Sequence, residues 1–185
     1  SIVPAARQCR IHARDPSRAN VSELKTYIAT VADFPRPGIL FRDIMPLLRE
    51  RFAETVAALG RLLSDAEWDG IDAVAGIESR GFILASALAE RRGKGFVPIR
   101  KKGKLPPPVV DRSYDLEYGT GVLEMQRGHG CLLLIDDVLA TGGTAAAAVR
   151  RVKESGARSV RFACLIASPE GVQNFHDDQP DVPIF

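Results

Sequence analysis

The sequence predicts an α/β fold in which helices flank a parallel sheet, and three observations lead to this prediction. Short apolar runs alternate along the chain with segments whose apolar residues recur at helical spacing, as in a sheet with crossover helices. One run, residues 131–135, is apolar throughout, which is typical of a strand buried on both faces of a parallel sheet. The chain has 185 residues, of which 45% are hydrophobic, and this suits one domain with a substantial core.

The N-terminal part of the chain is predicted to be less regular than the rest. Residues 1–20 show no clear period and form an N-terminal arm, whereas residues 21–185 are expected to form a single domain. Ser22 is the candidate N-cap of a short helix that runs to Ile28. Residues 34–44 hold two prolines and a glycine, so we predict an ordered loop there, without helix or strand.

Farther along the chain, regular elements are predicted from residue spacing and from apolar runs. Helices are expected where apolar residues recur every three or four positions, at residues 52–63, 82–92 and 144–154. Strands are expected over the apolar runs at residues 71–75, 96–99, 132–135, 160–166 and 182–185. These elements follow one another in the order that builds a parallel sheet.

Residues 101–127 interrupt this alternation. They contain three consecutive prolines, followed by two runs in which apolar and polar residues alternate, 114–118 and 122–126. We predict a flexible hairpin that projects from the sheet. Because long insertions in α/β domains often cover active sites, we expect this hairpin to act as a lid.

The most informative segment joins the apolar run to the helix that follows it. Asp136 and Asp137 come directly after the strand, and a loop of Thr and Gly at residues 140–144 leads into the helix. Glycines let the backbone turn sharply, and the first turn of a helix offers free N–H groups and the positive end of its dipole, so this loop suits a phosphate. The two carboxylates would repel a phosphate and suit hydroxyl groups or a metal ion. A phosphate with hydroxyls nearby describes a sugar phosphate.

Other kinds of loop fit this segment less well. It lacks the lysine of a Walker loop and the G-x-G-x-x-G spacing of a dinucleotide-binding loop. An ordinary strand-to-helix turn with an Asp N-cap would account for the two glycines. It would not account for two adjacent carboxylates at the end of an apolar strand, because buried carboxylates are costly without partners.

Cations follow two of the other predicted strands. Arg80 follows one strand, and a basic cluster at residues 100–104 follows the next. Ligands of open α/β sheets bind beyond the carboxyl ends of the strands, so we expect both to converge with residues 136–144 on one cleft. From the residues alone, Arg80 and the basic cluster could also be solvated surface groups. Anion binding is favoured at Arg80, because a cation near a helix N-terminus is electrostatically misplaced unless an anion binds there.

Composition argues against other classes of function. The net charge of +2 is too low to indicate a general nucleic-acid surface, and no apolar run approaches the length of a membrane span. The three cysteines, Cys9, Cys131 and Cys164, lie far apart, so a reducing cytoplasm is the simplest location to predict. We therefore expect neither a nucleic-acid partner nor a membrane.

Four stretches of the sequence together resemble the type I phosphoribosyltransferase family, and within it the members that use adenine. They are residues 33–44, residues 76–82, residues 100–106 with 113–119, and residues 134–144, and they occur in the family's order. The resemblance extends from about residue 21 to residue 167. It implies that the α/β domain carries a small N-terminal hood, at about residues 33–44, and a flexible lid, at about residues 101–127.

The resemblance implies transfer of phosphoribose from 5-phosphoribosyl pyrophosphate to adenine, which yields AMP and pyrophosphate in purine salvage. Mg²⁺ would be the cofactor, held mainly through the substrate, with Asp136 and Asp137 as candidate protein ligands. Two alternatives stay open: a related transferase for guanine, hypoxanthine or xanthine, and a regulatory protein that senses phosphoribosyl pyrophosphate. The short N-terminal arm and the low net charge disfavour the regulator.

The resemblance also assigns the residues that would hold the ribose phosphate. Asp136 and Asp137 would bind the ribose hydroxyls. The phosphate would be held by the hydroxyls of Thr141 and Thr144 and by backbone N–H groups of the loop Ala140, Thr141, Gly142, Gly143 and Thr144.

For the pyrophosphate, the resemblance implies a loop of Glu78, Ser79 and Arg80, with Arg80 taking part in catalysis. The Glu78–Ser79 peptide is often cis in such enzymes. The basic cluster would add Arg100, Lys101 and Lys104. Arg100 and Lys104 would reach the active site of the partner subunit in a homodimer.

The base would be held by the hood and closed in by the lid. Main-chain groups of Leu40, Phe41 and Arg42 would read the adenine edge, while Phe41 and Leu139 would pack against its faces. From the residues alone, Phe41 could equally be a core aromatic.

Two residues of the lid would complete the site. Glu117 would contact the imidazole edge of the purine and handle its proton, and Tyr118 would close over the site and exclude water. Without the resemblance, Glu117 is one exposed carboxylate on an alternating strand.

Overall fold

The computed structural model describes the backbone of residues 20–116, 119–127 and 130–185, and the side chains of the same residues apart from 111–116 and 119–121. The predicted site residues Glu117 and Tyr118 lie outside the described residues, as does nearly all of the N-terminal arm. The chain divides into two compact units, with the boundary between Ala58 and Leu59.

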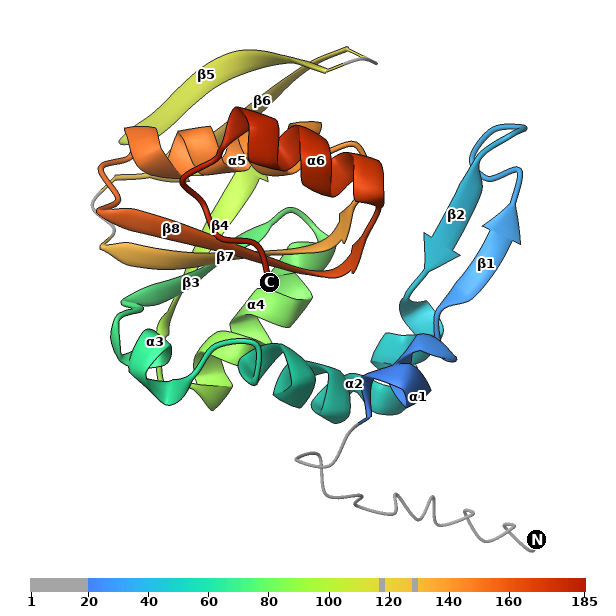
Figure 1. Cartoon of the computed structure of the whole chain (residues 1–185). Helices are drawn as coiled ribbons and strands as arrows, with labels where there is room; N and C mark the ends of the chain where they lie inside the picture. The colour runs from blue at the N-terminus through green and yellow to red at the C-terminus, as the bar shows by residue number, and fades with distance from the viewer. Residues whose placement is uncertain (1–19, 117–118, 128–129) are drawn as a thin grey trace, which may run out of the picture. The chain divides into compact units, whose positions relative to one another are not determined.

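The N-terminal unit holds a short helix and a two-stranded hairpin (Figure 1). Helix α1 (Val21–Lys25) begins after Asn20, whose side chain accepts the N–H of Ser22 at 2.9 Å. The prediction of Ser22 as the N-cap is therefore wrong, because the Asn20 side chain takes that role. Strand β1 (Ala29–Ala32) pairs with β2 (Leu40–Asp43) in antiparallel register.

Strand β2 corrects the prediction of an irregular loop over residues 34–44. The connecting loop covers only the residues between the two strands, where the N–H of Gly38 donates to Oδ1 of Asp33 at 2.7 Å. This hydrogen bond turns the chain back, so that β2 meets β1. The prolines precede the strand and do not interrupt its ladder, so they gave no reason to exclude a strand after them.

Two helices follow the hairpin along the chain. Helix α2 (Met45–Gly60) begins before the predicted helix of residues 52–63, and its backbone is not helical at Arg51. Helix α3 (Asp65–Asp69) begins with a capping box in which Ser64 and Glu67 exchange hydrogen bonds. Sequence periodicity does not detect so short a helix, but the capping residues mark its start.

The second unit is built on a six-stranded sheet with the strand order β5-β6-β4-β3-β7-β8. The strands are β3 (Ala73–Ile77), β4 (Gly95–Lys101), β5 (Val109–Leu116), β6 (Gly119–Gln126), β7 (Cys131–Leu139) and β8 (Ser159–Ala167). Strands β3, β4, β7 and β8 are parallel, as predicted.

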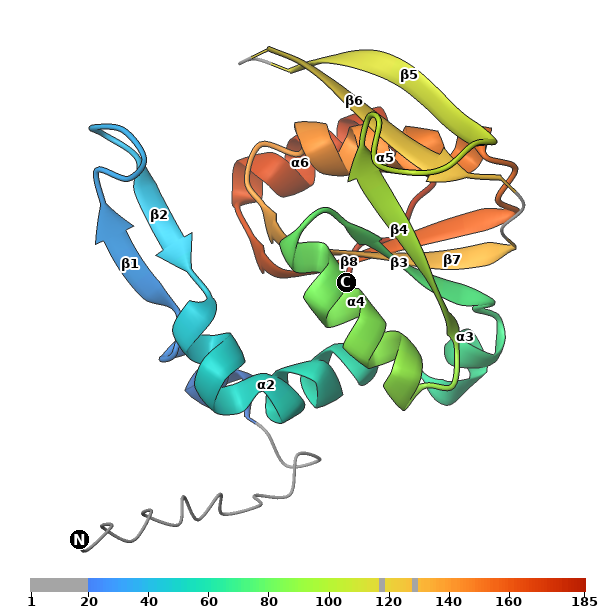
Figure 2. The same ribbon diagram turned by 180° about the vertical axis from the view of Figure 1, so that it is seen from behind.

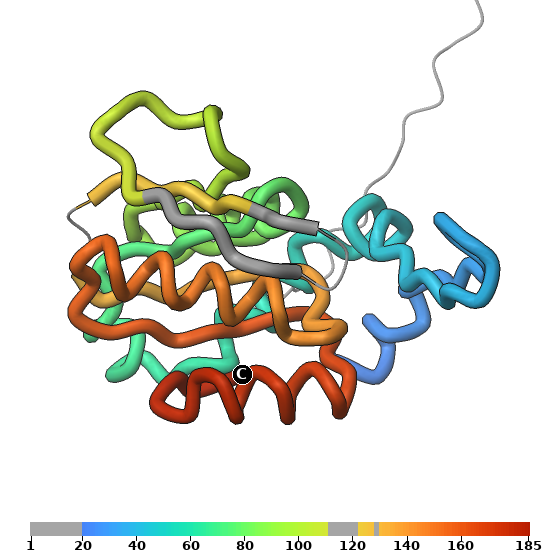
Figure 3. The backbone as a smooth tube through the Cα atoms, turned by 90° about the horizontal axis from the view of Figure 1, so that it is seen from above, coloured from blue at the N-terminus to red at the C-terminus, as the bar shows by residue number. Residues whose placement is uncertain are grey.

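The hairpin of β5 and β6 makes the sheet mixed instead of purely parallel. Strand β6 joins the sheet in antiparallel direction where Arg100 and Lys101 of β4 pair with Glu124 and Leu123. The hairpin therefore continues the sheet beside helix α5 and does not simply project from it (Figures 1 and 2). The connection between β4 and β5 loops out from the body of the unit (Figure 3). Alternation along a strand does not reveal which edge the strand pairs with, so the sequence left this open.

Helices cover both faces of this sheet. Helix α4 (Arg80–Arg91) lies on one face, and helices α5 (Gly143–Glu154) and α6 (Pro169–Asp178) lie on the other (Figures 1 and 2). The first two confirm the predicted helices at residues 82–92 and 144–154. Helix α6 was not predicted, although Ser168 at its N-cap followed by proline is a recognisable start signal.

The core of the second unit is centred on β7. Leu132, Leu133, Leu134 and Ile135 have no exposed surface, as expected for a strand between two parallel neighbours. The predicted strand at residues 182–185 is corrected to a single bridge between Ile184 and Phe162 of β8.

A stability prediction follows from the contact between β3 and α4. A Cβ added at Gly76 would lie 2.7 Å from the carbonyl oxygen of Gly81 and 2.9 Å from Cβ of Ala85. Gly76→Ala should therefore lower the free energy of unfolding by about 1–3 kcal/mol, as overpacking does. Urea unfolding measures the loss. Gly95→Ala on β4 is the matched control, because its Cβ would meet nothing nearer than 3.6 Å. Equal unfolding free energies for the two variants would contradict the prediction.

Candidate functional site

The carboxyl ends of β4, β3 and β7 meet at one edge of the sheet, as the sequence predicts. Ile77 pairs with Ile99, and Gly76 pairs with Ile135. Residues 78, 100 and 136 therefore lie near one another at the same end of the sheet. This arrangement brings together the pyrophosphate loop, the basic cluster and the carboxylate pair that the sequence singled out.

The two carboxylates lie within β7 and not beyond its end. The strand runs on to Leu139 because its last residues keep pairing with β8, where Val138 pairs with Ile166. Asp137 is 7% exposed, and Asp136 is partly buried. Oδ1 of Asp136 accepts the N–H of Asp137 at 2.9 Å. The strand thus delivers both carboxyl groups to a place where water is scarce.

Burial, and after it the neighbouring charge of Asp137, raise the pKa of Asp136 from its ordinary value to about 8. Arg80 acts in the opposite direction and lowers the pKa of Asp136. A second charge beside Asp137 is disfavoured, so Asp136 is expected to keep its proton near neutral pH. Such a pair can both donate hydrogen bonds to hydroxyl groups and accept them.

Arg80 is the cationic partner of the pair. Its Nη1 lies 3.0 Å from Oδ2 of Asp137. The sequence predicted that a cation at the start of this helix needs an anion, and the structure supplies a carboxylate from β7. The ion pair fixes the start of α4 against the strand that carries both acids.

The loop at residues 140–144 has the features of an anion site. Gly142 adopts a left-handed backbone with φ of +89° and stands at the N-cap of α5. The first turn of α5 contains no acidic residue, and no side chain caps it. Thr141, Gly143 and Thr144 are exposed. Free amides, a positive helix end and two accessible hydroxyls together suit a phosphate.

Helix α6 and its N-cap residue contact the backbone of this loop, and the sequence did not reveal these contacts. The side-chain amide of Asn174 donates to the carbonyl of Thr141 at 3.1 Å, and the Ser168 hydroxyl donates to the carbonyl of Ala140. A Cβ at Gly142 would lie 2.9 Å from the carbonyl oxygen of Gly171. The start signal of α6 was readable from the sequence, but nothing in it indicated that Asn174 contacts the loop.

The loop after β3 is tied to the basic cluster. The Glu78–Ser79 peptide is cis, which confirms the prediction. The Glu78 carboxylate accepts the N–H of Lys101 at 3.0 Å and lies 3.3 Å from Nε of Arg100. The Lys101 amide and Arg100 hold the pKa of Glu78 below its usual value, so this carboxylate stays ionised. The structure therefore gives Glu78 a role between two loops of its own chain.

The residues predicted to hold the base belong to two different units of the chain. Leu139 is 1% exposed and belongs to the core, so it offers a base almost no surface. Leu40, Phe41 and Arg42 lie on β2 of the N-terminal unit. There, Phe41 packs edge-on against Phe34, with ring centroids 5.1 Å apart.

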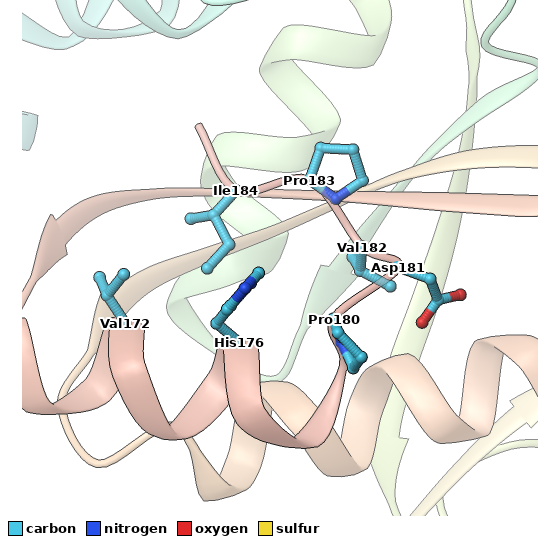
Figure 4. A pocket seen from close by; sticks show the side chains of 7 residues that line it. All are labelled: Val172, His176, Pro180, Asp181, Val182, Pro183 and Ile184. Atoms are coloured by element: carbon cyan, nitrogen blue, oxygen red, sulfur yellow. The ribbon is translucent and has the colours of Figure 1, made fainter.

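A pocket beside the C-terminal segment is separate from these loops. It lies between α6 and residues 180–184, and the His176 ring faces into it beside Val172 and Ile184 (Figure 4). No residue of the three loops lines it.

Within the described part of the chain, no helix is long and apolar enough to cross a membrane.

The carboxylate pair predicts a pH dependence of stability. The folded protein keeps a proton on Asp136 that the unfolded chain releases above its ordinary pKa of 3.8. The wild type should therefore lose stability as pH rises from about 4 to about 8. Asp136→Asn removes this loss, so its melting temperature should exceed that of the wild type at pH 8, with the gap closing as pH falls to about 4.

Asp72→Asn is the control for this series of melting curves. A backbone N–H from Cys131 and the Arg158 guanidinium lower the pKa of Asp72, so its contribution has the opposite sign. The wild type should be more stable than Asp72→Asn at neutral pH and lose that advantage as pH falls below about 4. A pH-independent gap for Asp136→Asn would show that its carboxyl group titrates normally.

Known proteins match this fold and this sequence. The phosphoribosyl transferase domain family matches residues 48–182. An adenine phosphoribosyltransferase of Hydrogenovibrio crunogenus is 51% identical over 144 residues, which cover 77% of this chain and 84% of that protein.

Solved structures agree with the sequence matches. The adenine phosphoribosyltransferase of Saccharomyces cerevisiae, complexed with an imino-altritol bisphosphate and adenine, has a TM-score of 0.79 at 33% identity and covers 89% of this chain and 96% of its own. That of Rhodothermus marinus has a TM-score of 0.76 at 44% identity, covering 89% and 94%. The extent of these matches shows that the chain belongs to the phosphoribosyltransferase family, among the adenine phosphoribosyltransferases.

Proposed function

We propose that this protein transfers phosphoribose from 5-phosphoribosyl pyrophosphate to N9 of adenine, with AMP and pyrophosphate as products. The observation that carries the proposal is the segment from Asp136 to Thr144, in which two carboxylates on a buried strand precede an uncapped helix N-terminus. This segment suits the hydroxyls and the phosphate of one ligand. Adenine as the acceptor is supported by the names of the relatives and by the adenine in the yeast complex.

The reaction breaks the bond between C1 of the ribose and a pyrophosphate oxygen, and N9 of adenine forms the new bond to C1. Positive charge develops on the ribose, and the pyrophosphate leaves with the electron pair. Arg80, Arg100, Lys101 and Lys104 would stabilise the leaving group, so positioning and electrostatics would supply most of the acceleration. Glu117 would accept the N9 proton, which adds about 10²–10⁴-fold.

Mg²⁺ fits this site as a partner of the substrate. Among the residues that the structure describes, no group of three His, Cys, Asp or Glu could hold a metal alone. Mg²⁺ usually keeps several waters and binds through one or two carboxylates and substrate phosphates. Asp136 and Asp137 would be those carboxylates, and the bound ion would neutralise charge on the pyrophosphate.

A panel of purine bases tests the proposed activity. With phosphoribosyl pyrophosphate and Mg²⁺, adenine should give AMP, and hypoxanthine, guanine and xanthine should react at least about 100-fold more slowly, because unpaired polar groups penalise the wrong base. Chromatography of the nucleotides measures this. Comparable rates with guanine would assign the protein to the 6-oxopurine transferases, and binding of phosphoribosyl pyrophosphate without any nucleotide product would favour a regulator.

A homodimer is supported by an apolar face on α4 and β4. Ile83 is 43% exposed and Phe96 is 38% exposed, and the Phe82 and Phe96 rings pack edge to face at 5.7 Å. Arg100 lies near the end of β4, and its guanidinium is 6.0 Å from the Phe82 ring of α4. A second copy of the chain that covers this face would receive Arg100 at its own site.

The cytoplasmic location likewise stays a prediction.

Subunit exchange tests whether Arg100 serves the partner. Arg100→Ala and Glu117→Ala should each be nearly inactive alone. In a heterodimer of the two, one site would carry both defects and the other none, so activity should recover to about half of the wild-type level per dimer. Mixing two Arg100→Ala preparations is the control and should recover nothing. Verified exchange without recovery would place Arg100 in its own chain's site or outside any site.

A further inference from the structure

A buried carboxylate that lies outside the predicted site residues holds the basic cluster in place. Glu124 of β6 is 2% exposed and accepts the N–H of Gly103 at 2.9 Å and those of Lys104 and Leu105 at 2.6 Å each. Hydrogen bonds to a carboxylate are stronger than bonds between neutral groups, and a buried carboxylate without them would be costly. Glu124 and this turn therefore fix each other.

The remaining amides of the loop also have partners. The N–H of Lys101 donates to Glu78 at 3.0 Å, and that of Lys102 donates to the carbonyl of Val122 at 2.9 Å. Every backbone N–H from Lys101 to Leu105 thus has an acceptor within the chain. An anion can be bound by this loop only through its side chains.

The turn has the geometry of a backbone anion site that is already filled. Gly103 has a φ of +81°, and the successive N–H groups after it converge on one carboxylate. Similar concave arrangements of amides bind phosphates in other proteins. Glu124 takes the place of such an anion, so a pyrophosphate cannot be drawn into the turn.

Arg100 is connected to the same turn. Its Nη1 donates to the carbonyl of Lys104 at 3.2 Å, and Arg100 itself pairs with Glu124 across the β4–β6 ladder. The backbone from which the Lys104 side chain projects is therefore set by Glu124 on one side and by Arg100 on the other. The Lys104 side chain stays exposed.

We propose that Glu124 is a positioning residue for pyrophosphate binding, which orders the turn of residues 103–105 so that Arg100 and Lys104 present their charges to the ligand. The inference rests on the proposed function, in which these cations bind the pyrophosphate. Because its carboxylate is buried and accepts the amides of the turn, Glu124 would act through the turn and not through direct contact with the ligand.

Glu124→Gln tests this role with little change of shape. The amide keeps one acceptor oxygen but directs an N–H group at a backbone N–H, so the turn loses order. We expect the Kd for phosphoribosyl pyrophosphate, measured by calorimetry in Mg²⁺ buffer, to rise about tenfold, as one lost charged hydrogen bond predicts. The KM for adenine should stay unchanged. Glu124→Asp, which keeps the charge but is one methylene shorter, should shift the Kd in the same direction by less.

Asp72→Asn is the matched control. Asp72 also accepts a backbone N–H, that of Cys131 at 2.7 Å. It precedes β3 and so lies at the amino end of this strand, opposite the carboxyl end where the candidate site is. It should lower the melting temperature without changing the Kd. An unchanged Kd in both Glu124 variants, with the fold kept, would overturn the proposal. Since binding is read directly, absence of AMP formation by the wild type would count against the proposed function alone.

A double-mutant cycle separates positioning from general stability. If Glu124 acts through Arg100 and Lys104, then Glu124→Gln should raise the Kd much less in a background that carries both Arg100→Ala and Lys104→Ala than in the wild type. Equal fold-changes in the two backgrounds would show that Glu124 affects binding by another route, and the proposal would fail.

Discussion

The site depends on the ion pair between Arg80 and Asp137. Strand β7 is fully buried from Leu132 to Ile135, and its continuation to Leu139 places both carboxyl groups where water is scarce. An ionised carboxylate in that position needs a cation, and Arg80 provides one at 3.0 Å. Since Arg80 opens α4 directly after β3, and β3 pairs with β7, this single contact aligns the loop proposed to bind pyrophosphate with the two acids proposed to bind the ribose. The backbones approach closely enough that a Cβ at Gly81 would lie 2.7 Å from the Ile135 carbonyl oxygen.

Much of the fold and the centre of the site could be predicted, because both depend on patterns that are local in sequence. Apolar runs and helical spacing located β3, β4, β7 and β8, and strand ends located three loops on one edge. The strand arrangements that the sequence did not predict depend on pairing between separate segments. Strand β2 needs its partner β1, and the β5–β6 hairpin needs the edge of β4. Neither partnership leaves a mark within the segment itself.

The run of cationic residues in the sequence identified the basic cluster, but it did not identify the carboxylates that order the backbone of this cluster. The cations are adjacent in sequence, whereas the carboxylates that order their backbone come from elsewhere: Glu78 from the loop after β3 and Glu124 from β6. Read singly, Glu78 looked like a member of an anion loop, and Glu124 was one acidic residue on an alternating strand. Their function is visible only when the acceptor of each loop amide is known. A loop of like charges remains ordered here because its amides, and not its side chains, bind the nearby carboxylates.

In the proposed reaction, the two halves of the ligand would meet loops that are built differently. The phosphate loop leaves its amides at the α5 N-terminus uncapped and is supported from behind through Asn174 and Gly171 of α6, so its backbone is available to a ligand. The basic cluster has its amides occupied and offers only side chains. A monoester phosphate that stays bound throughout the reaction suits a fixed backbone cradle, because its charge does not change. A leaving pyrophosphate gains charge as the bond breaks, and long cationic side chains can follow it outward, which a backbone site cannot do.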